Sequence, residues 1–397
     1  DRKRRMVKMI LSTIAAAMAV SSVVVAQDTS LRHRRLQYDQ QQQGGYGQAP
    51  PPDQQQQQQQ MAPPQAGGGA NMPYALPASA AEWCTPSILP PLPYEECEKK
   101  DTLNSVPLYG GLTNSLKIVL LGTILSFEEG RCLIVDESES ELIKRKDSSQ
   151  GLQSFINRYF EPIGLDATSS KVDNFKKRNK IKVRSWDEVW SDYDHNRRTY
   201  GHLSDIESLK YFKMEGHQLK RAMMRRMWRP LPQVRDATCS ALANHGLQEE
   251  FITISIRQGD KKSEENFEFA TMQQYVDEAE RSIPVHFGGV VPKIFVATDD
   301  CGVLPELRAL RPQWTFVSQC DLHSEQGFAL KDMKDWSLEM TDEHFHKFFV
   351  ELFAMASAKV FIGIWYTNVT WWAFFMRSAD RTTFKLLDTP GVEDRES

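Results

Sequence analysis

The second half of the chain alternates short apolar runs with longer stretches in which apolar residues recur every three or four positions. Apolar runs of strand length occupy 251–256, 293–298, 315–318, 359–364 and 383–387. Helical periodicity fills the gaps between them, at 271–282, 303–310, 343–357 and 369–377. This β-α repeat predicts a parallel, doubly wound sheet.

A smaller β-α pattern precedes this region. A glycine loop at 109–114 leads into a helical pattern over 115–127, and an apolar run at 131–136 reads as a buried parallel strand. The residues from 138 to 246 are more charged and less periodic, apart from a helical stretch at 219–228. We therefore expect an α/β protein of two lobes, with ligand bound where the strands end.

The amino terminus has the pattern of a targeting segment. Five basic residues, Arg2, Lys3, Arg4, Arg5 and Lys8, precede 18 uncharged residues at 9–26. Because a membrane span takes about 20 residues, residues 1–27 fit either a signal peptide or a single-pass signal anchor. The basic flank predicts that the chain beyond it enters the lumen, which places the protein in the secretory pathway.

The next segment, residues 28–99, is dominated by Gln, Pro, Gly and Ala, with glutamine runs at 40–43 and 54–60. It holds too few large apolar residues to form a core, so we predict a disordered stem. Aggregation through the glutamine runs is the alternative, and we favour the stem because a tether needs only this composition.

Charge and cysteine spacing exclude two classes of function. The formal net charge of the 397 residues is -4, which disfavours nucleic acid as a partner. The six cysteines lack the paired spacing of a structural zinc site. We expect a disulfide between Cys84 and Cys97, which flank a proline-rich stretch, and a buried free thiol at Cys132.

A candidate binding residue stands at the end of the strand predicted for 251–256. Arg257 follows this strand directly, and Gly259, Asp260 and Lys261 follow it in turn. A guanidinium can bind phosphate oxygens in a bidentate way, and a nearby lysine adds a point charge that stabilises a leaving diphosphate. The alternative is a salt-bridged surface turn.

Three segments of this half resemble the α-1,6-fucosyltransferases and related inverting fucosyltransferases. They are Ser255 to Glu265, Val296 to Asp300 and Glu351 to Asn368, with Tyr275 between the first two. The resemblance covers about residues 246–377, and the loop at 110–114 matches more loosely. It implies a GT-B-like fold of two Rossmann-like lobes, with the acceptor side at 100–245 and the nucleotide-sugar lobe at 246–390.

The resemblance also implies a metal-independent reaction with GDP-fucose as donor, no cofactor, and a glycan or glycoprotein as acceptor. A Golgi membrane protein of type II orientation, or a secreted form of it, would suit that reaction. The residues that would bind the donor are Gly111, Asn114, Arg257, Asp260, Lys261, Asp300, Glu351 and Thr367. The catalytic residues would be Arg257, Lys261 and a general base, Glu265.

Each implied role fits the chemistry of the side chain. A carboxylate such as Glu351 can accept two guanine protons, and Thr367 is an ordinary phosphate contact. Inverting transfer needs a base near the acceptor hydroxyl, which Glu265 or its neighbour Glu264 would supply. A helix-surface carboxylate at 351 and a solvated acidic loop at 264–265 are the alternatives.

Two residues depart from the pattern of the family. Ser255 replaces a histidine and Gln258 replaces an arginine, so the donor pocket loses an imidazole and one positive charge. Two alternatives therefore stay open. One is a glycosyltransferase for another nucleotide sugar, and the other is a catalytically inactive glycan-binding homologue.

Three further patterns favour structural roles over ligand binding. Asp299 and Asp300 resemble a metal-binding pair, but we expect them to shape the cleft. The run 225–230 is basic, and we expect a solvated helix end more than an anionic site. The aromatic residues Trp365, Tyr366, Trp371, Trp372, Phe374 and Phe375 are expected to be mostly core.

Overall fold

A computed structural model describes part of the chain. The described residues are 82–85, 103–108, 110–129, 131–138, 140–145, 152–164, 172, 177, 180–183, 216–259, 269–320, 330–365, 367–377 and 381–388. All of them belong to one compact unit, and a second unit, residues 1–65 and 261–267, contains none of them. The predicted targeting segment and nearly all of the predicted stem therefore lie outside the described residues.

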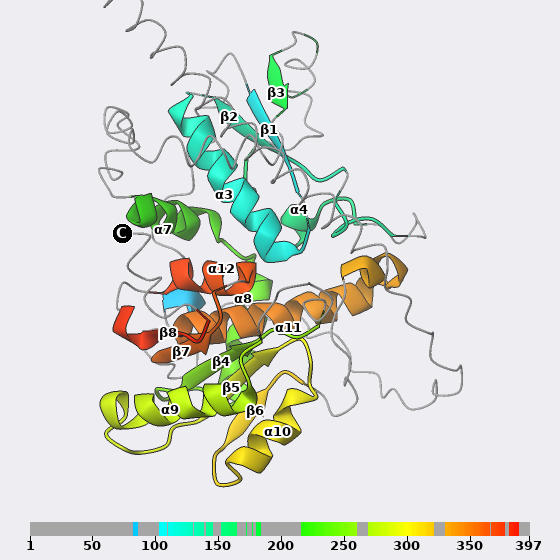
Figure 1. The fold of residues 1–397 in the computed structure, drawn as a ribbon. Helices are drawn as coiled ribbons and strands as arrows, with labels where there is room; N and C mark the ends of the chain where they lie inside the picture. The colour runs from blue at the N-terminus through cyan, green and yellow to red at the C-terminus, as the bar shows by residue number, and fades with distance from the viewer. Residues whose placement is uncertain are drawn as a thin grey trace, which may run out of the picture. The chain divides into compact units, whose positions relative to one another are not determined.

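Parallel strands of the first half form one sheet. Its strands are β1 (Leu103–Pro107), β2 (Cys132–Asp136) and β3 (Ile181–Val183), and the order within the described residues is β2-β1-β3. The helices of this half are α3 (Leu112–Glu128), α4 (Phe155–Tyr159), α7 (Gly216–Met227) and α8 (Pro232–Asn244). Figure 1 shows α3 lying along β1 and β2, which it contacts in the fold.

The second half forms a larger parallel sheet of order β6-β5-β4-β7-β8 (Figure 1). The strands are β4 (Ile252–Ile256), β5 (Ile294–Thr298), β6 (Phe316–Ser318), β7 (Val360–Gly363) and β8 (Phe384–Leu386). The helices are α9 (Met272–His286), α10 (Val303–Leu310), α11 (Leu338–Ser357) and α12 (Asn368–Met376), with 3-10 turns η7 (Leu330–Asp335) and η8 (Arg381–Thr383).

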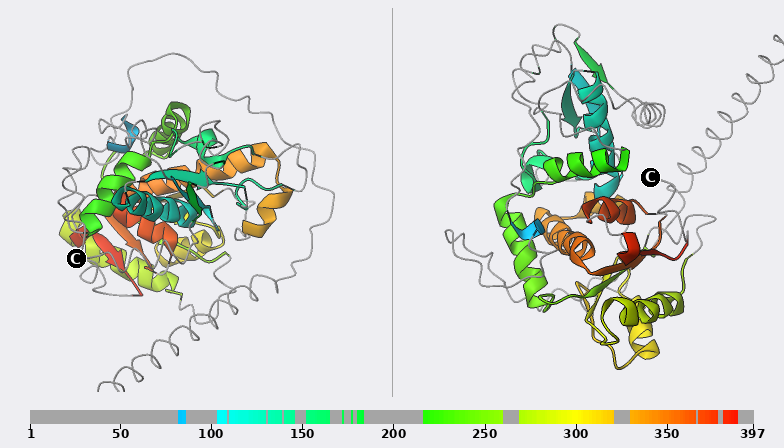
Figure 2. Two further views of the ribbon diagram at one scale, coloured as in Figure 1. Left: turned by 90° about the horizontal axis from the view of Figure 1, so that it is seen from above. Right: turned by 90° about the vertical axis from the view of Figure 1, so that its left-hand side faces the viewer.

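Helices cover both faces of this larger sheet. Along β4, Ile252, Ile254 and Ile256 pack in one apolar cluster with residues of α9 and α10. Thr253 points to the opposite face, where its hydroxyl donates to the carbonyl of Ala354 in α11 at 3.1 Å. The views in Figures 1 and 2 agree that α11 lies on the other side of the sheet from α9 and α10. A parallel sheet covered on both faces confirms the predicted α/β fold class.

The predicted elements of the second half are confirmed to within a few residues at their ends. The main difference is α11, which begins at Leu338 and not near Glu343, because Ser337 caps it by accepting from the backbone N–H of Met340. In the first half the prediction missed β1, β3, α4 and α8. Among the described residues, no helix is both long and apolar enough to cross a bilayer.

Both cysteine predictions are wrong. Cys84 forms a disulfide with Cys239 on α8, and Cys132 is also disulfide-bonded, while Cys97 lies outside the described residues. Cys239 is buried on the face of α8 that packs in the core, so folding brings it to Cys84 across 155 positions. Cys132 is the first residue of β2, and β2 ends the strand order within the described residues, so apolar neighbours along the strand do not prevent its sulfur from forming a disulfide.

The basic run at 225–230 is not the solvated helix end that the sequence predicted. Arg226 is buried, Arg225 forms an ion pair with Glu82 at 2.6 Å, and Arg229 forms one with Glu161. These arginines therefore connect α7 to neighbouring segments. The predicted aromatic core is confirmed for the four aromatic residues of α12, because Trp371, Trp372, Phe374 and Phe375 are all buried.

Candidate functional site

Arg257 lies at the carboxyl end of β4, beside the end of β5. Parallel register pairs Ile256 with Thr298, so the next residues, Arg257 and Asp299, leave the two strands side by side. Arg257 Nη1 donates to Asp299 Oδ2 at 3.0 Å, and the Asp299 side chain is only 5% exposed. A guanidinium anchored by a buried carboxylate keeps a fixed orientation at the edge where parallel sheets bind ligands.

Asp299 also holds the turn that follows β4. Its two carboxylate oxygens accept the backbone N–H groups of Gln258 at 2.8 Å and of Gly259 at 3.0 Å. One buried carboxylate therefore fixes both the side chain of Arg257 and the backbone that leads away from it. The predicted donor residues Asp260 and Lys261 and the predicted base Glu265 lie beyond this turn, outside the described residues.

Glu351 on α11 reaches the same edge of the sheet. Its Oε1 accepts the backbone N–H of Thr298, the last residue of β5, at 3.1 Å. Burial, reinforced by the nearby charge of Asp299, raises the pKa of the Glu351 carboxyl to about 8. The Thr298 hydrogen bond, Arg257 and Lys347 oppose this rise without cancelling it. A carboxyl that titrates near neutral pH is a common feature of functional sites.

The face of α11 that carries Glu351 also carries His344 and Lys347. The spacing of three and seven positions places all three on one side of a helix. Burial, together with the positive charges of Arg257 and Lys347, lowers the pKa of His344 to about 4. His344 is therefore neutral at pH 7, and its ring lies 5.1 Å from that of Trp336.

A second group of predicted residues surrounds the start of α12. The Asn368 amide donates to Asn114 Oδ1 at 3.1 Å, and Lys117 Nζ donates to Asn368 Oδ1 at 3.4 Å. Thr367 is buried and caps α12, because its hydroxyl accepts the backbone N–H of Thr370 at 3.1 Å. The start of this helix presents backbone donors of the kind that bind anions.

The glycine loop before α3 belongs to this second group through Asn114. Gly110 adopts a positive φ of 68°, which explains the glycine at that position. Gly111 needs no such explanation, and a Cβ added there would meet nothing within 4 Å. The space beside Gly111 would admit close approach of a ligand to the backbone.

The acidic pair at the end of β5 has two separate structural roles. Asp299 anchors Arg257, whereas Asp300 is buried and accepts the backbone N–H of Gly302 at 2.9 Å, ahead of α10. Among the residues that the structure describes, no cluster of His, Cys, Asp and Glu could hold a metal ion.

Sequence reasoning missed the roles of three residues at this edge. Asp299 was expected to shape the cleft and not to pair with Arg257, although the register of β4 and β5 makes the two residues neighbours. His344 and Lys347 could have been found from their helical spacing to Glu351.

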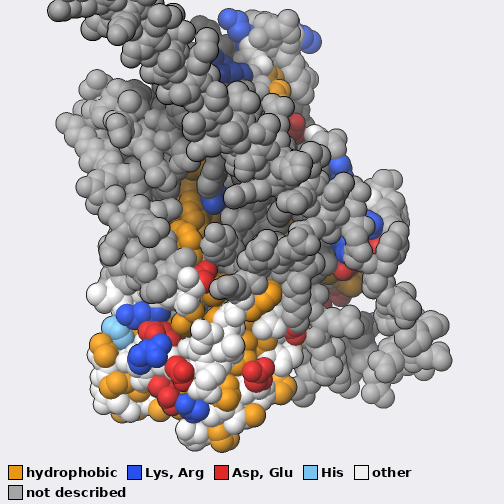
Figure 3. Space-filling view, viewed as in Figure 1, with side chains coloured by type: hydrophobic (Ala, Val, Ile, Leu, Met, Phe, Trp, Pro, Cys, Tyr) orange, Lys and Arg blue, Asp and Glu red, His pale blue; other side chains and the backbone are white. Residues whose placement is uncertain are grey.

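The surface over α9 differs from the candidate site, because basic and acidic side chains are interspersed there (Figure 3), as in the ion pairs Arg281–Glu278 and Arg311–Glu280.

Comparisons with known proteins give likenesses of fold. Neither a protein-family model nor a curated protein sequence matches the chain. Among solved structures, NodZ α-1,6-fucosyltransferase soaked with GDP-fucose is 14% identical, with a TM-score of 0.44 over 70% of this chain and 93% of that chain. The fucosyltransferase NodZ from Bradyrhizobium is also 14% identical, with a TM-score of 0.43 over the same shares.

Two further structures are similar at lower scores. POFUT1 in complex with GDP is 10% identical, with a TM-score of 0.38 over 72% of this chain and 98% of that chain. A mutant of Arabidopsis thaliana FUT1 in complex with GDP is 11% identical, with a TM-score of 0.39 over 72% and 75%. At TM-scores below 0.5 these likenesses carry no conclusion about activity or about single residues.

Proposed function

We propose that the protein is a glycosyltransferase that binds a GDP-sugar, with GDP-fucose as the preferred donor, and transfers the sugar with inversion to a glycan or glycoprotein. The observation that carries the proposal is the pairing of a fixed cation and a titratable carboxyl at one sheet edge. Arg257 is anchored by Asp299, and Glu351 is anchored by Thr298 at the end of the neighbouring strand.

The two groups suit the two ends of a guanosine diphosphate. The guanidinium of Arg257 would bind the diphosphate and stabilise the charge that develops on it as the sugar leaves. The carboxylate of Glu351, once ionised, would accept the two N–H groups of the guanine edge. Lys261 would add a second charge and Glu265 would act as base, as the resemblance of the sequence implies.

A glycan-binding protein without transferase activity is the second candidate. It is favoured by position 255, where Ser255 is 2% exposed within β4 and offers no imidazole to a ligand. Gln258 likewise brings no second guanidinium to the turn. Donor binding and donor turnover are therefore separate questions for this site.

Calorimetry and a turnover assay separate these candidates. The protein should bind GDP more tightly than UDP or ADP, and should release GDP from GDP-fucose in the presence of a glycan acceptor. GDP binding without release, together with glycan binding, would favour the inactive homologue. Equal affinity for all three nucleotides would contradict the role of Glu351 in base recognition.

A further inference from the structure

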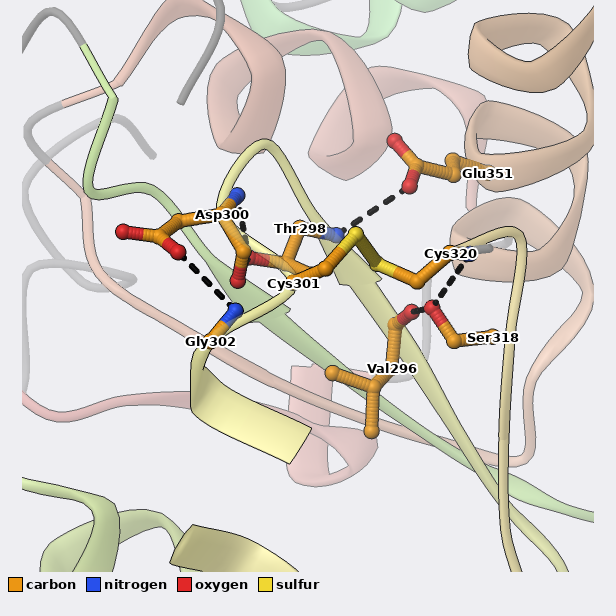
Figure 4. The surroundings of a disulfide bond; sticks show 8 residues. All are labelled: Val296, Thr298, Asp300, Cys301, Gly302, Ser318, Cys320 and Glu351. Carbon is orange, nitrogen blue, oxygen red and sulfur yellow. Dashed lines mark hydrogen bonds between the residues drawn. A yellow bond between two sulfur atoms is a disulfide. The ribbon is translucent and has the colours of Figure 1, made fainter. Parts of the chain in front are cut away.

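A disulfide bond ties the loop after β5 to the edge of the larger sheet. Cys301 follows Asp300 directly, and Cys320 lies two residues beyond the end of β6, with a Cα separation of 5.6 Å (Figure 4). β6 is a three-residue strand at one end of the strand order, and within the described part of the chain its backbone pairs with β5 alone. The covalent bond therefore holds the two strand ends together where the sheet has few hydrogen bonds of its own.

Hydrogen bonds continue the connection on both sides of the disulfide. The Ser318 hydroxyl donates to the carbonyl of Val296 at 2.8 Å and accepts the N–H of Cys320 at 3.2 Å. In the β5 loop, the Thr298 hydroxyl donates to the carbonyl of Asp300 and accepts its N–H, both at 3.1 Å. Figure 4 shows these bonds around the disulfide, at the end of β5.

The end of β5 and the loop after it supply the groups that position the two candidate donor-binding side chains. Its Asp299 carboxylate anchors Arg257, and the N–H of Thr298 anchors Glu351. Cys301 is two residues from Asp299 and three from Thr298. A shift of the loop would therefore move both anchors together, and with them the cation and the carboxyl.

We propose that the Cys301–Cys320 disulfide is a positioning element of the donor site, which fixes the β5 loop so that Arg257 and Glu351 face a nucleotide diphosphate in one geometry. This inference rests on the proposed function. It assigns the disulfide a role in ligand affinity, beyond any role in the stability of the fold.

The chain offers a matched control in its other described disulfide. Cys84–Cys239 joins positions 155 apart, whereas Cys301–Cys320 joins positions 19 apart. In the chain-entropy account the longer loop contributes more to stability, so removing the control bond should lower the melting temperature at least as much. It joins Cys84 to α8 and none of the anchors of Arg257 or Glu351.

The experiment compares the wild-type protein with two double variants, Cys301→Ser with Cys320→Ser, and Cys84→Ser with Cys239→Ser. Melting temperature and GDP affinity by calorimetry are measured for each. Loss of Cys301–Cys320 should weaken GDP binding about tenfold, the scale of one impaired charge-assisted hydrogen bond. Loss of Cys84–Cys239 should leave the GDP affinity of the folded protein within about twofold.

A third variant keeps the test decisive if the first double variant does not fold. Ser318→Ala retains the disulfide but removes the hydroxyl that connects Val296 and Cys320, and it should weaken GDP binding about threefold. The inference would be overturned if GDP affinity were unchanged in whichever of these two variants folds, Cys301→Ser with Cys320→Ser or Ser318→Ala. That result would leave the proposed function standing. A wild-type protein that does not bind GDP would overturn both.

Discussion

Helix α11 carries carboxyl groups on two opposite faces, and their electrostatic situations differ. Glu351 shares its face with His344 and Lys347, and burial raises its pKa to about 8. Asp342 lies on the other face, toward α4, where Arg158 forms an ion pair with it and the Tyr159 hydroxyl donates to its Oδ1 at 2.6 Å.

The pKa of Asp342 moves in the opposite direction. Burial alone would raise it, but the hydrogen bonds from Arg158 and Tyr159 outweigh burial and lower it. Asp342 is therefore ionised and paired at neutral pH, and it connects α11 to α4. The surroundings of Glu351 disfavour its charged form, and strongly shifted pKa values of this kind are concentrated at functional sites.

The largest expected effect on GDP affinity comes from removing Arg257, the cation near Glu351. Arg257→Ala should weaken GDP binding by about a hundredfold, because a diphosphate would lose its fixed partner and the buried Asp299 would lose its ion pair. Isothermal titration with GDP measures this effect. The control is Arg281→Ala on α9, whose side chain is 65% exposed, and it should change neither affinity nor stability. Comparable GDP affinity in both variants would contradict the site.

The next test uses the pKa of Glu351. Guanine recognition requires the ionised carboxylate, so GDP binding should release a proton, and affinity should rise up to about tenfold per pH unit between pH 6 and 8. Glu351→Gln should bind GDP more weakly and without this slope. Glu343→Gln, at an exposed position of the same helix, should keep the wild-type slope.

Ionisation of Glu351 should also affect the free energy of unfolding, which should fall as pH rises, whereas GDP affinity should increase. A carboxyl whose pKa is raised by folding stabilises the protein below its unfolded pKa, and this contribution is lost as pH rises toward 8. Glu351→Gln should therefore flatten the fall in free energy of unfolding between about pH 5 and 8. A parallel stability profile for wild type and variant would show that Glu351 is not desolvated in the folded protein.

Substitution of Asp342, on the opposite face of α11, should change the free energy of unfolding and leave GDP affinity unchanged. Asp342→Asn should reduce the free energy of unfolding by about 1 kcal/mol at pH 7, a modest loss because both Arg158 and Asp342 are partly exposed. Since the pKa of Asp342 is lowered, its contribution is present above about pH 4 and disappears as the pH falls below that. Denaturation at pH 7 and pH 3 measures the difference, and unchanged GDP affinity distinguishes this face from the other.

Sequence patterns predicted the larger sheet well because strands such as β5 and β7 are almost continuously apolar and helices such as α9 and α11 are long, with 15 and 20 residues. Short elements such as β3 and α4 carry too few residues for a periodic signal. The position of Arg257 followed from the end of an apolar run, but its partner did not. Asp299 is 42 positions away, and only the register of two parallel strands makes them neighbours.

The pKa of Glu351 in the candidate site likewise depends on contacts that sequence patterns do not reveal. Glu351 stood out in the sequence through resemblance, yet its raised pKa depends on burial against Thr298 and on charges from three different elements. The disulfide between Cys84 and Cys239 is another example, because proximity in sequence favoured Cys97 as the partner of Cys84. Local patterns indicate elements, whereas long-range packing decides partners.

The smallest expected effect tests how the charges on one face of α11 act together. Lys347 lowers the pKa of Glu351, so Lys347→Met should raise the pH midpoint of GDP binding by about half a unit. The Lys347 side chain is 35% exposed, so salt should screen its influence. The displacement between the two pH profiles should therefore shrink at 1 M NaCl. A midpoint that does not move at low salt would mean that Lys347 has no part in setting the pKa of Glu351, and that Lys347 belongs to the solvated surface of the helix.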